Sequence, residues 1–480
     1  MVAGILGYGI YIPKLRIKRE DIGKAWGGRG RGENSVANSN EDVITMAVEA
    51  SQNAVAHSGV VPSELGAIYL GTTSAPQIEQ SSVGMIGLTL GCQPAMDVAD
   101  FGASPRASIA ALKACCDAVN SGRIRYGLVI GSDCRLGEPG SELESNMGAA
   151  AVALVIGQGD AVAQIEKIHT YSTAFRDAWR ANGQKYLNMF EPRFNREYGF
   201  ERHVRTAAND LFKDTGRSIT DFKYVVFQQP DDRLHRTVAR TLKVTPEQMD
   251  AANIFPVIGD CGSASVLLGL AAVLDRAKAG ERIMAVSYGS GASDALTLIA
   301  GHYIEQKRPK ERNYQSYLSS KEYIDYYTFL KYTGALKRPG KPADLGMPAM
   351  TPLLSSYRQA PELLRLLGGK CQRCGYVNFP PSERRICIRC GYTRFDRVAL
   401  ARRGKIHTYT IAYVLPPGFN ETPLPMIIAD LDDGVKHRAI GTEMKPEQVK
   451  IGTEVELVLR IISDEDGVNV YGNAFRIPRK

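Results

Sequence analysis

Two segments of the chain, 104–133 and 262–291, follow the same pattern, and this repetition restricts the possible folds more than any other feature. Each starts with small residues, continues as an apolar helix rich in Ala and Leu, passes a turn with glycine and ends in a buried strand that finishes in GSD or GSG. Repetition of such a unit about 160 residues apart predicts a domain made of two similar halves. Helices this rich in small side chains are expected between sheets, where larger side chains would not fit.

The first 300 residues alternate between apolar runs typical of strands and segments typical of helices. Strands are predicted at 3–11, 66–71, 127–131, 150–156, 223–228 and 283–287, and helices at 41–57, 104–121, 200–215, 232–242 and 263–278. Alternation at this spacing is typical of α/β layers. We expect an N-terminal half over 1–165, a C-terminal half over 166–337, and a linker over 338–369 that begins in a Pro/Gly stretch.

Four cysteines in the pattern C-x2-C-x12-C-x2-C, Cys371, Cys374, Cys387 and Cys390, predict a zinc ribbon over 370–394. Each CxxC is a tight turn that directs two thiolates to one point, and the glycine after each pair permits that turn. Four sulfur ligands leave no coordination position for water, which indicates a structural Zn²⁺ site. Two disulfides or four unrelated cysteines are the alternatives. After the ribbon, about five short strands with turn signals over 395–480 predict a small β-barrel.

The composition restricts the protein's surroundings and ligands. The N-terminal segment places its apolar run before its charges and has no small-residue cleavage site, so we interpret it as a first strand. No apolar run reaches the roughly 18 residues of a membrane span. Five further cysteines, an odd number, favour a reducing compartment and a cytoplasmic protein. The net charge of +8 is dispersed without RNA-binding aromatic signatures, which favours a phosphate-bearing ligand over nucleic acid.

Stretches in both halves resemble the archaeal-type hydroxymethylglutaryl-CoA (HMG-CoA) synthases of the thiolase superfamily, over residues 2–337. They are GYGIYIPKLRI, EDVITMAVEAS, SGRIRYGLVIGSD, DFKYVVFQQP, LLGLAAVLDRAKAGERI, SYGSGASDA and YIDYYTFLKY. The resemblance implies the α/β fold class, as a duplicated, thiolase-like, five-layer αβαβα fold. Residues 370–480 resemble the zinc-ribbon and OB-fold proteins that accompany thiolases and HMG-CoA synthases. That resemblance implies an OB fold for the barrel, and a module that bridges subunits and helps to hold the CoA tail.

The HMG-CoA synthase resemblance implies four catalytic groups, and this chain replaces all of them. The nucleophilic Cys falls on Pro105, the Glu on Thr73, the His on Gln228 and the Asn on Asp260. Proline has neither a nucleophilic atom nor an N–H, so acyl-cysteine chemistry is not expected at this position. A register shifted by one residue would place Ser104 there, which without a nearby His is a weak nucleophile. Among the free cysteines, Cys261 is the closest in sequence to these positions.

Other features that the resemblance associates with acyl-CoA are retained. Arg233 stands where the family has a Lys for the CoA phosphate, and His203 lies in the matching helix. The turn that contains Gly291 and Ala292 is expected to offer a backbone N–H to a thioester oxygen. A solvent-exposed arginine and a buried structural histidine are the alternatives for Arg233 and His203.

Two functions agree with these replacements. The first is an aldolase or retro-aldolase that acts at a C–C bond beside a CoA thioester without a covalent intermediate. Asp260, expected in a buried apolar site, would be the base, Gln228 would donate to a carbonyl, and Thr73 or Ser104 would relay a proton. The alternative is a catalytically inactive subunit that binds acyl-CoA within a thiolase complex. For either function the fold implies a homodimer or a hetero-complex with a thiolase, and no nucleic-acid or membrane partner.

Overall fold

The computed structural model describes residues 2–336, 353–381, 385–415, 423–465 and 467–479. The chain divides into two compact units. The first comprises Met1–Asn38, Asp42–Gly87 and Cys92–Ala335, and the second comprises Ser39–Glu41, Leu88–Gly91 and Leu336–Lys480. No helix within the described ranges combines the length and apolar character that crossing a bilayer requires.

A nine-stranded sheet in the first unit contains the predicted duplication. The N-terminal half contributes the order β1-β7-β6-β4-β5, and the C-terminal half contributes β8-β13-β12-β11. The two halves join where β1 and β8 pair antiparallel, at Gly4↔Gln164 and Ile5↔Ala163. The strands of the N-terminal half are β1 (Gly4–Tyr11), β4 (Leu65–Gly71), β5 (Asp97–Phe101), β6 (Tyr126–Cys134) and β7 (Ala149–Gly157). Those of the C-terminal half are β8 (Ala163–Ser172), β11 (Tyr224–Phe227), β12 (Arg282–Gly289) and β13 (Ala292–Ala300).

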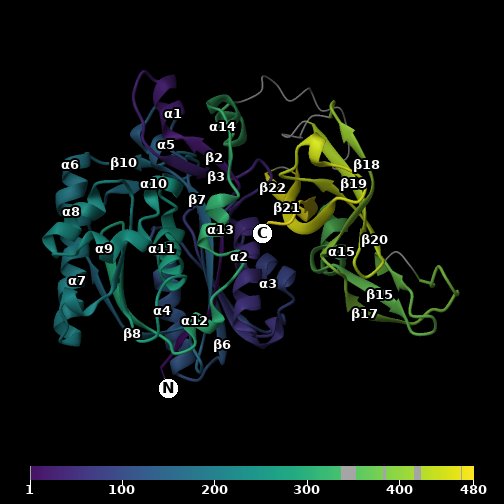
Figure 1. Ribbon diagram of the computed structural model, residues 1–480, viewed down its shortest axis with the longest axis horizontal. Coiled ribbons are helices and arrows are strands. Elements are labelled where there is room, and N and C mark those ends of the chain that lie inside the picture. The colour runs from purple at the N-terminus through teal and green to yellow at the C-terminus, as the bar shows by residue number, and fades with distance from the viewer. Residues whose placement is uncertain (1, 337–352, 382–384, 416–422, 466, 480) are drawn as a thin grey trace. The chain divides into compact units, whose positions relative to one another are not determined.

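Helices cover both faces of each half and complete five layers, as Figure 1 shows. Helix α2 (Val43–Ser58) packs on β1, β6 and β7, and α7 (Arg202–Thr215) packs on β8, β12 and β13. Helices α4 (Ala107–Asn120) and α11 (Ser265–Leu274) lie between the two sets of strands. Helix α11 contacts strands of both halves, and all ten of its residues are buried. Its small and aliphatic side chains fit this central position, as the sequence predicts.

The predicted strands and helices named above are present, with ends shifted by a few residues. The capping box of Asp42 and Thr45 and the left-handed Gly59 fix the start and the end of α2. Strands β5, β8 and β13 were not predicted. The polar faces of β8 and the small residues of β13 (ASDALTLIA) give a weak strand pattern, and pairing between neighbours decides their structure.

The two halves differ at their outer edges. Strand β5 pairs with β4 in the N-terminal half, but the equivalent segment of the C-terminal half is helical. It forms α9 (Pro246–Met249), the 3-10 turn η4 (Asp250–Ala252) and α10 (Phe255–Ile258), after α8 (Leu234–Thr241) and before η5 (Gly262–Ala264). Strand β11 is therefore the outermost strand of its half within the described sheet.

Shorter elements complete the first unit. A three-stranded sheet joins β14 (Glu322–Tyr323), β2 (Leu15–Lys18) and β3 (Glu33–Val36), and a small hairpin pairs β9 (Ala178–Trp179) with β10 (Asn188–Met189). The remaining helical elements are α1 (Arg19–Ala25), η1 (Pro62–Glu64), α3 (Val83–Leu90), α5 (Glu142–Asn146), α6 (Pro192–Phe194), the π-helix η2 (Asn195–Glu201), η3 (Ile219–Asp221), α12 (Ile304–Lys307), α13 (Tyr314–Ser319) and α14 (Tyr326–Tyr332).

The second unit consists of a helix, a small sheet and a closed barrel. Helix α15 (Leu353–Arg365) lies within the range predicted as linker, whose residues 338–352 are outside the described ranges. The sheet contains β16 (Val377–Asn378), β15 (Leu367–Cys371) and β17 (Phe395–Ala399), in that order. The barrel closes in the order β18-β19-β20-β22-β21, as predicted for an OB fold. Its elements are β18 (Arg403–Ala412), β19 (Leu424–Leu431), β20 (Lys436–Gly441), η7 (Pro446–Gln448), β21 (Glu454–Glu465) and β22 (Val468–Arg476).

Candidate functional site

Three of the four positions predicted as catalytic, Thr73, Gln228 and Asp260, connect to one loop, residues 262–263, at the start of η5. Gln228 follows β11, and its Nε2 donates to the carbonyl oxygen of Gly262 at 3.0 Å. The N–H of Gly262 donates to Oδ1 of Asp260 at 2.9 Å. The next N–H, of Ser263, donates to Oδ2 of Asp133 at 2.7 Å, and the same carboxylate accepts from Thr73. Thr73, Gln228 and Asp260 thus belong to one connected network.

Asp133 is the acceptor at the centre of this network. It lies near the end of β6, is fully buried and receives five hydrogen bonds from protein donors. Besides the Ser263 N–H, they come from Thr72 Oγ1 (3.0 Å), Thr73 N (2.7 Å), Thr73 Oγ1 (3.0 Å) and Ser74 Oγ (2.6 Å). Three of these donors bond to Oδ1 and two bond to Oδ2, so both oxygens of Asp133 are occupied. The Thr73 hydroxyl proton is therefore already engaged.

Asp260 forms a buried ion pair with Arg135, whose guanidinium donates to Oδ2. The expectation of an apolar surrounding for Asp260 is wrong, because this cation and the Gly262 N–H occupy both of its oxygens. Burial lowers the pKa of Arg135, but the negative charges of Asp260 and Asp133 outweigh it and raise that pKa. Asp260 is therefore held in place as an ion-pair partner.

Gln228 and Arg135 each retain one buried polar atom without a partner. Oε1 of Gln228 and Nε of Arg135 are buried and make no hydrogen bond with the described residues. An unpaired buried acceptor costs about 1–3 kcal/mol. The amide of Gln228 therefore has acceptor capacity left, beside the loop that its donor side holds.

Ser104 and Pro105 lie against the turn between β12 and β13. A Cβ atom added to Gly289 would stand 2.4 Å from Ser104 Oγ and 2.6 Å from Pro105 Cδ. Ser290 and Gly291 connect the strands with φ angles of 50° and 73°, the signs of a type I′ turn. Gly291 accepts from the Thr173 N–H at 2.8 Å, and Ala292 begins β13. The residues implied for the nucleophile and for the thioester turn are therefore neighbours.

Ser104 has no base beside it among the described residues. Its Oγ accepts a 3.4 Å hydrogen bond from the Arg106 N–H, and its hydroxyl proton has no acceptor there. Arg106 is the N-cap of α4, and its Nε and Nη2 donate to the two carboxylate oxygens of Asp294 in β13, at 2.7 and 2.6 Å. This bidentate pair links the N-terminal half to the C-terminal half directly beside Pro105.

Four free cysteines of the first unit, Cys115, Cys116, Cys134 and Cys261, have raised pKa values. Burial raises the pKa of Cys116 to about 12, and burial together with Asp42 and Asp133 raises the pKa of Cys134 to about 12. Burial, and then the charge of Asp260, raises the pKa of Cys261 well above its ordinary value. The pKa of Cys115 is raised by burial in the same direction. Thiols with raised pKa values are poor nucleophiles at neutral pH, which argues against these four cysteines as nucleophiles.

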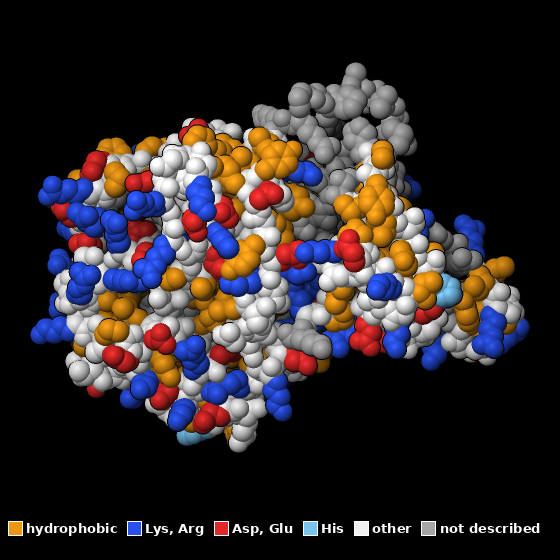
Figure 2. Space-filling view, turned by 45° about the horizontal axis from the view of Figure 1, so that its top comes forward, with side chains coloured by type: hydrophobic (Ala, Val, Ile, Leu, Met, Phe, Trp, Pro, Cys, Tyr) orange, Lys and Arg blue, Asp and Glu red, His pale blue; other side chains and the backbone are white. Residues whose placement is uncertain are grey.

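Arg233, predicted to bind the CoA phosphate, and His203, predicted to bind substrate or CoA, differ in accessibility. Arg233 is exposed at the start of α8, where Asp231 caps its N–H. His203 is buried, with Nδ1 2.6 Å from the Gly199 oxygen and Nε2 2.8 Å from Thr173 Oγ1. Both ring nitrogens of His203 therefore have protein partners. Figure 2 shows Lys and Arg side chains gathered around the end of the first unit that carries α6, α7 and α8.

The four predicted metal ligands come together in the second unit. The sulfur atoms of Cys371, Cys374, Cys387 and Cys390 all lie within 4.8 Å of one another. Two of the separations are 3.6 Å, close to the roughly 3.8 Å expected around a tetrahedral Zn²⁺. Each CxxC forms the same turn, closed by Gly375 or Gly391 at φ angles of 70° and 72°. Burial raises the pKa of Cys387, but hydrogen bonds from the N–H groups of Arg389 and Cys390 outweigh burial and lower that pKa to about 6. This donor set fits a metal ion.

Sequence reasoning missed Asp133, Arg135 and Arg180 as members of the network. Asp133 and Arg135 lie at the end of β6, in the motif GSDCR that served only as a mark of the repeat. Two charged residues at the end of a buried strand were the sequence signal that could have identified them. Arg180 follows the hairpin strand β9 and donates to the carbonyl oxygen of Thr73, a contact without any sequence signal.

Comparison with known proteins assigns both units. Residues 212–300 match the family "3-Oxoacyl-[acyl-carrier-protein (ACP)] synthase III C terminal", and residues 397–460 match "ChsH2, C-terminal OB-fold domain". Hydroxymethylglutaryl-CoA synthase of Methanopyrus kandleri is 39% identical over 343 residues, which cover 70% of this chain and 98% of that protein. The protein of the same name from Methanothermobacter thermautotrophicus is 38% identical over 345 residues, 70% of this chain and 99% of its own.

Solved structures show the same fold at lower identity. An HMG-CoA synthase crystallised in complex with CoA has a TM-score of 0.64 at 18% identity and covers 71% of this chain and 92% of its own. The 3-oxoacyl-[acyl-carrier-protein] synthase III of Aquifex aeolicus has a TM-score of 0.57 at 21% identity, with 62% and 99% covered. The predicted thiolase-like fold, followed by a four-cysteine cluster and an OB fold, is therefore confirmed.

Proposed function

The chain belongs to the hydroxymethylglutaryl-CoA synthase family over about 70% of its length, and from this premise we propose that it binds an acyl-CoA thioester without forming an acyl-enzyme. One observation supports the proposal: Pro105, the residue on which the resemblance places the nucleophile, lies against the β12–β13 turn, and burial raises the pKa values of Cys134 and Cys261. A proline side chain cannot attack a thioester. The scaffold then serves to hold acyl-CoA rather than to acylate itself.

The surface and the turn support this binding role. Arg233 is exposed at the start of α8 and would pair with a CoA phosphate, for which an arginine fork is well shaped. The turn at Gly291 and Ala292 would place backbone N–H groups near the thioester oxygen, next to Ser104. His203 would instead have a structural role, since its ring packs against those of Tyr171 and Tyr288.

A non-covalent aldol or retro-aldol reaction is the second candidate, and Ser104 favours it. Its hydroxyl proton has no acceptor among the described residues and so would be free to bond a substrate oxygen. Cleavage of a 3-hydroxyacyl-CoA would move the hydroxyl proton to a base, break the C2–C3 bond, release a carbonyl compound and protonate the thioester enolate at C2. Asp260 would be the base, Gln228 would polarise a carbonyl, and Thr73 would relay a proton. The ion pair with Arg135 opposes this role of Asp260.

The four cysteines would hold a structural Zn²⁺, since four thiolates saturate a tetrahedral ion. Binding would stabilise the segment between the two CxxC turns, because the apo form would bring like charges together. We expect one zinc per chain by atomic emission. A chelator that removes it should lower the melting temperature of the second unit, and Cys387→Ser should prevent zinc uptake.

Partners of two kinds would fit. A second copy of the chain would pair along β5, whose outer side is open in the described sheet and exposes 44% of Val98. A separate thiolase would suit the binding role, since it would supply the missing nucleophile. The free thiols agree with a reducing, cytoplasmic location.

Product analysis tests both candidates at once. The purified full chain is incubated with 3-hydroxyacyl-CoA and 3-oxoacyl-CoA thioesters, and mass spectrometry follows the CoA species and the intact protein. Binding without turnover, with no protein adduct, agrees with the binding role. Cleavage that disappears in Asp260→Ala and Ser104→Ala, but persists in the matched Ser121→Ala variant, establishes the lyase. A stable acyl adduct on the wild-type protein would contradict both.

A further inference from the structure

A cavity of about 430 Å³ lies at the outer edge of the C-terminal half, beside β11. Two glutamine side chains hold the helical segment 246–255 against this edge in place of a paired strand. Gln229 donates to the Ala252 carbonyl at 2.6 Å and accepts from the N–H groups of Ile254 and Phe255. Gln248 donates to Ile219 and Phe222 at 3.1 and 2.7 Å. Because side chains rather than backbone span the gap, space remains between β11, α8 and the segment.

This cavity is separate from the network around residues 262–263. Val225, Phe227 and Gln229 line the cavity, whereas Gln228 donates to Gly262. Successive side chains of an extended segment point to opposite faces. The cavity therefore opens on the face of β11 that packs against α8, and a ligand there would not contact Asp260.

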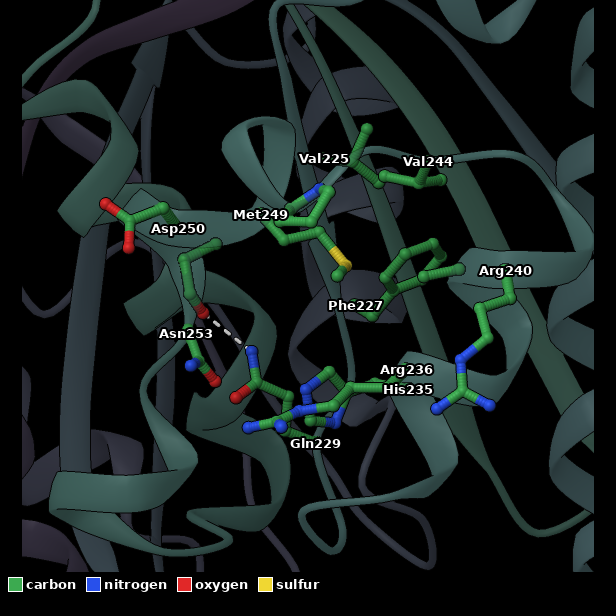
Figure 3. Close-up of a pocket in the computed structure, with 13 residues that line it drawn as sticks. Val225, Phe227, Gln229, His235, Arg236, Arg240, Val244, Met249, Asp250 and Asn253 are labelled. Atoms are coloured by element: carbon green, nitrogen blue, oxygen red, sulfur yellow. Dashed lines mark hydrogen bonds between the residues drawn. The ribbon is translucent and has the colours of Figure 1, made fainter.

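The lining has an apolar side and a polar side, as Figure 3 shows. Val225, Phe227, Val244 and Met249 lie together, and Ala239, Pro246 and Ala252 complete the apolar lining. The polar side is lined by Gln229, His235, Arg236, Arg240, Asp250 and Asn253. A mostly apolar pocket of several hundred Å³ with a few polar groups is typical of small-molecule sites.

The charge that remains unpaired at this cavity is positive. Arg236 pairs with Asp232 at 2.7 Å, and Asp250 pairs with Arg276 at 3.3 Å. Arg240 is exposed, one turn after Arg236 on α8, and its guanidinium has no hydrogen bond or ion pair with any residue of the described ranges. The buried Oδ1 of Asn253 likewise has no donor there.

We propose that this cavity binds a small carboxylate that carries an apolar chain. The carboxylate would pair with the planar fork of Arg240, and the chain would pack against Phe227, Val244 and Met249. A hydroxyl group on the chain would satisfy Oδ1 of Asn253. A cationic amphiphile would meet Arg240 and be repelled. The site is independent of the acyl-CoA role proposed above.

Calorimetric titration of the full chain with hexanoate tests the proposal, with hexylammonium and hexan-1-ol as probes of charge. Hexanoate is expected to bind at least tenfold more tightly than either. Arg240→Gln should weaken hexanoate binding at least tenfold and abolish the preference for it. Arg205→Gln on α7 is the matched control, an exposed arginine outside the cavity, and should leave the affinity unchanged. Equal binding of hexanol, or no effect of Arg240→Gln, would overturn the proposal.

A second measurement locates the ligand. Methionine methyl groups labelled with ¹³C are observed by NMR, and Met249→Leu assigns the resonance of Met249. Hexanoate should shift this resonance in the wild type and in Arg205→Gln, and the shift should disappear in Arg240→Gln at the same concentration. 3-Hydroxyhexanoate should bind more tightly than hexanoate, and Asn253→Ala should remove that difference. Saturable hexanoate binding without a shift at Met249 would place the ligand elsewhere and overturn the assignment, as would no binding at all.

Discussion

The two halves of the first unit share one topology but close their outer edges differently. The N-terminal half has a fifth strand, β5, whose residues alternate between half-buried and exposed and whose outer side is open in the described sheet. The C-terminal half lacks that strand, and Gln229 and Gln248 fasten a helical segment there instead. An open strand edge invites pairing, whereas a covered edge leaves a cavity. The two halves thus share a core arrangement and differ in how their outer edges are covered.

The largest expected effect concerns the connection between the halves. Arg106→Ala should lower the free energy of unfolding by about 3 kcal/mol, because it leaves the buried Asp294 carboxylate without its cation. Urea denaturation measures this change. Arg123→Ala is the control, since it breaks an exposed pair with Asp97 at the outer edge, where water screens the charges, and should cost clearly less. Equal losses would show that the Arg106–Asp294 ion pair contributes no more to stability than the exposed Arg123–Asp97 pair.

The covered edge is tested by Gln229→Leu. The substitution leaves the N–H groups of Ile254 and Phe255 without an acceptor, and we expect a loss of about 2 kcal/mol. Hydrogen exchange should speed up at those two amides first. Gln248→Leu removes a part-buried donor to the Ile219 and Phe222 carbonyls and an exposed acceptor of the Thr245 N–H, and should cost less because neither site is fully buried. A larger loss of unfolding free energy for Gln248→Leu would show that Gln229 is not the main attachment of the helical segment to β11.

The open edge is tested by Val98→Lys. A lysine on β5 should oppose its counterpart in a second copy and weaken self-association at least tenfold, which is about 1.4 kcal/mol. Sedimentation equilibrium measures the dissociation constant. Val61→Lys, at another exposed valine, should leave it unchanged. If Val98→Lys has no effect, the edge of β5 is not the interface between copies.

The smallest effect compares His57, a half-buried histidine of the N-terminal half, with His235, a buried histidine of the C-terminal half. Burial lowers the pKa values of His57 and His235 below the ordinary value near 6.5, so both are neutral in the fold and charged after unfolding in acid. Their contribution to stability is present above pH 6.5 and is lost as the pH falls below it. His57→Gln and His235→Gln should each reduce the slope of unfolding free energy between pH 7 and pH 5, by at most about 1.4 kcal/mol per pH unit. A slope unchanged in both variants would contradict the assigned burial.

Local patterns account for much of what could be predicted. The CxxC spacing predicted that the four sulfurs lie together, because each CxxC pair is held by its own local turn and glycine. The Ala-rich pattern of α11 predicted its central position correctly. Strands β8 and β13 escaped prediction because their stability comes from pairing with each other rather than from alternation along the chain.

The environment of Asp260 depended on partners distant in sequence. The sequence shows an aspartate where the resemblance implies an asparagine. It does not show Arg135, which lies 125 positions earlier and reaches Asp260 only in the folded chain. The same holds for Asp133, whose donors come from residues 72–74 and from residue 263. The prediction of an apolar site failed because hydrophobic neighbours in sequence do not reveal a charged neighbour in space.

The sequence by itself determined the duplicated α/β core, the four-cysteine cluster and the barrel, since each depends on residue type, period or short spacing. Only the tertiary structure decided that Asp260 is neutralised by Arg135, that His203 has both nitrogens occupied, and that a helical segment replaces the fifth strand beside β11. The physical reason is that ion pairs, hydrogen bonds and cavities act between atoms within a few ångströms, and folding chooses those neighbours without regard to their order along the chain.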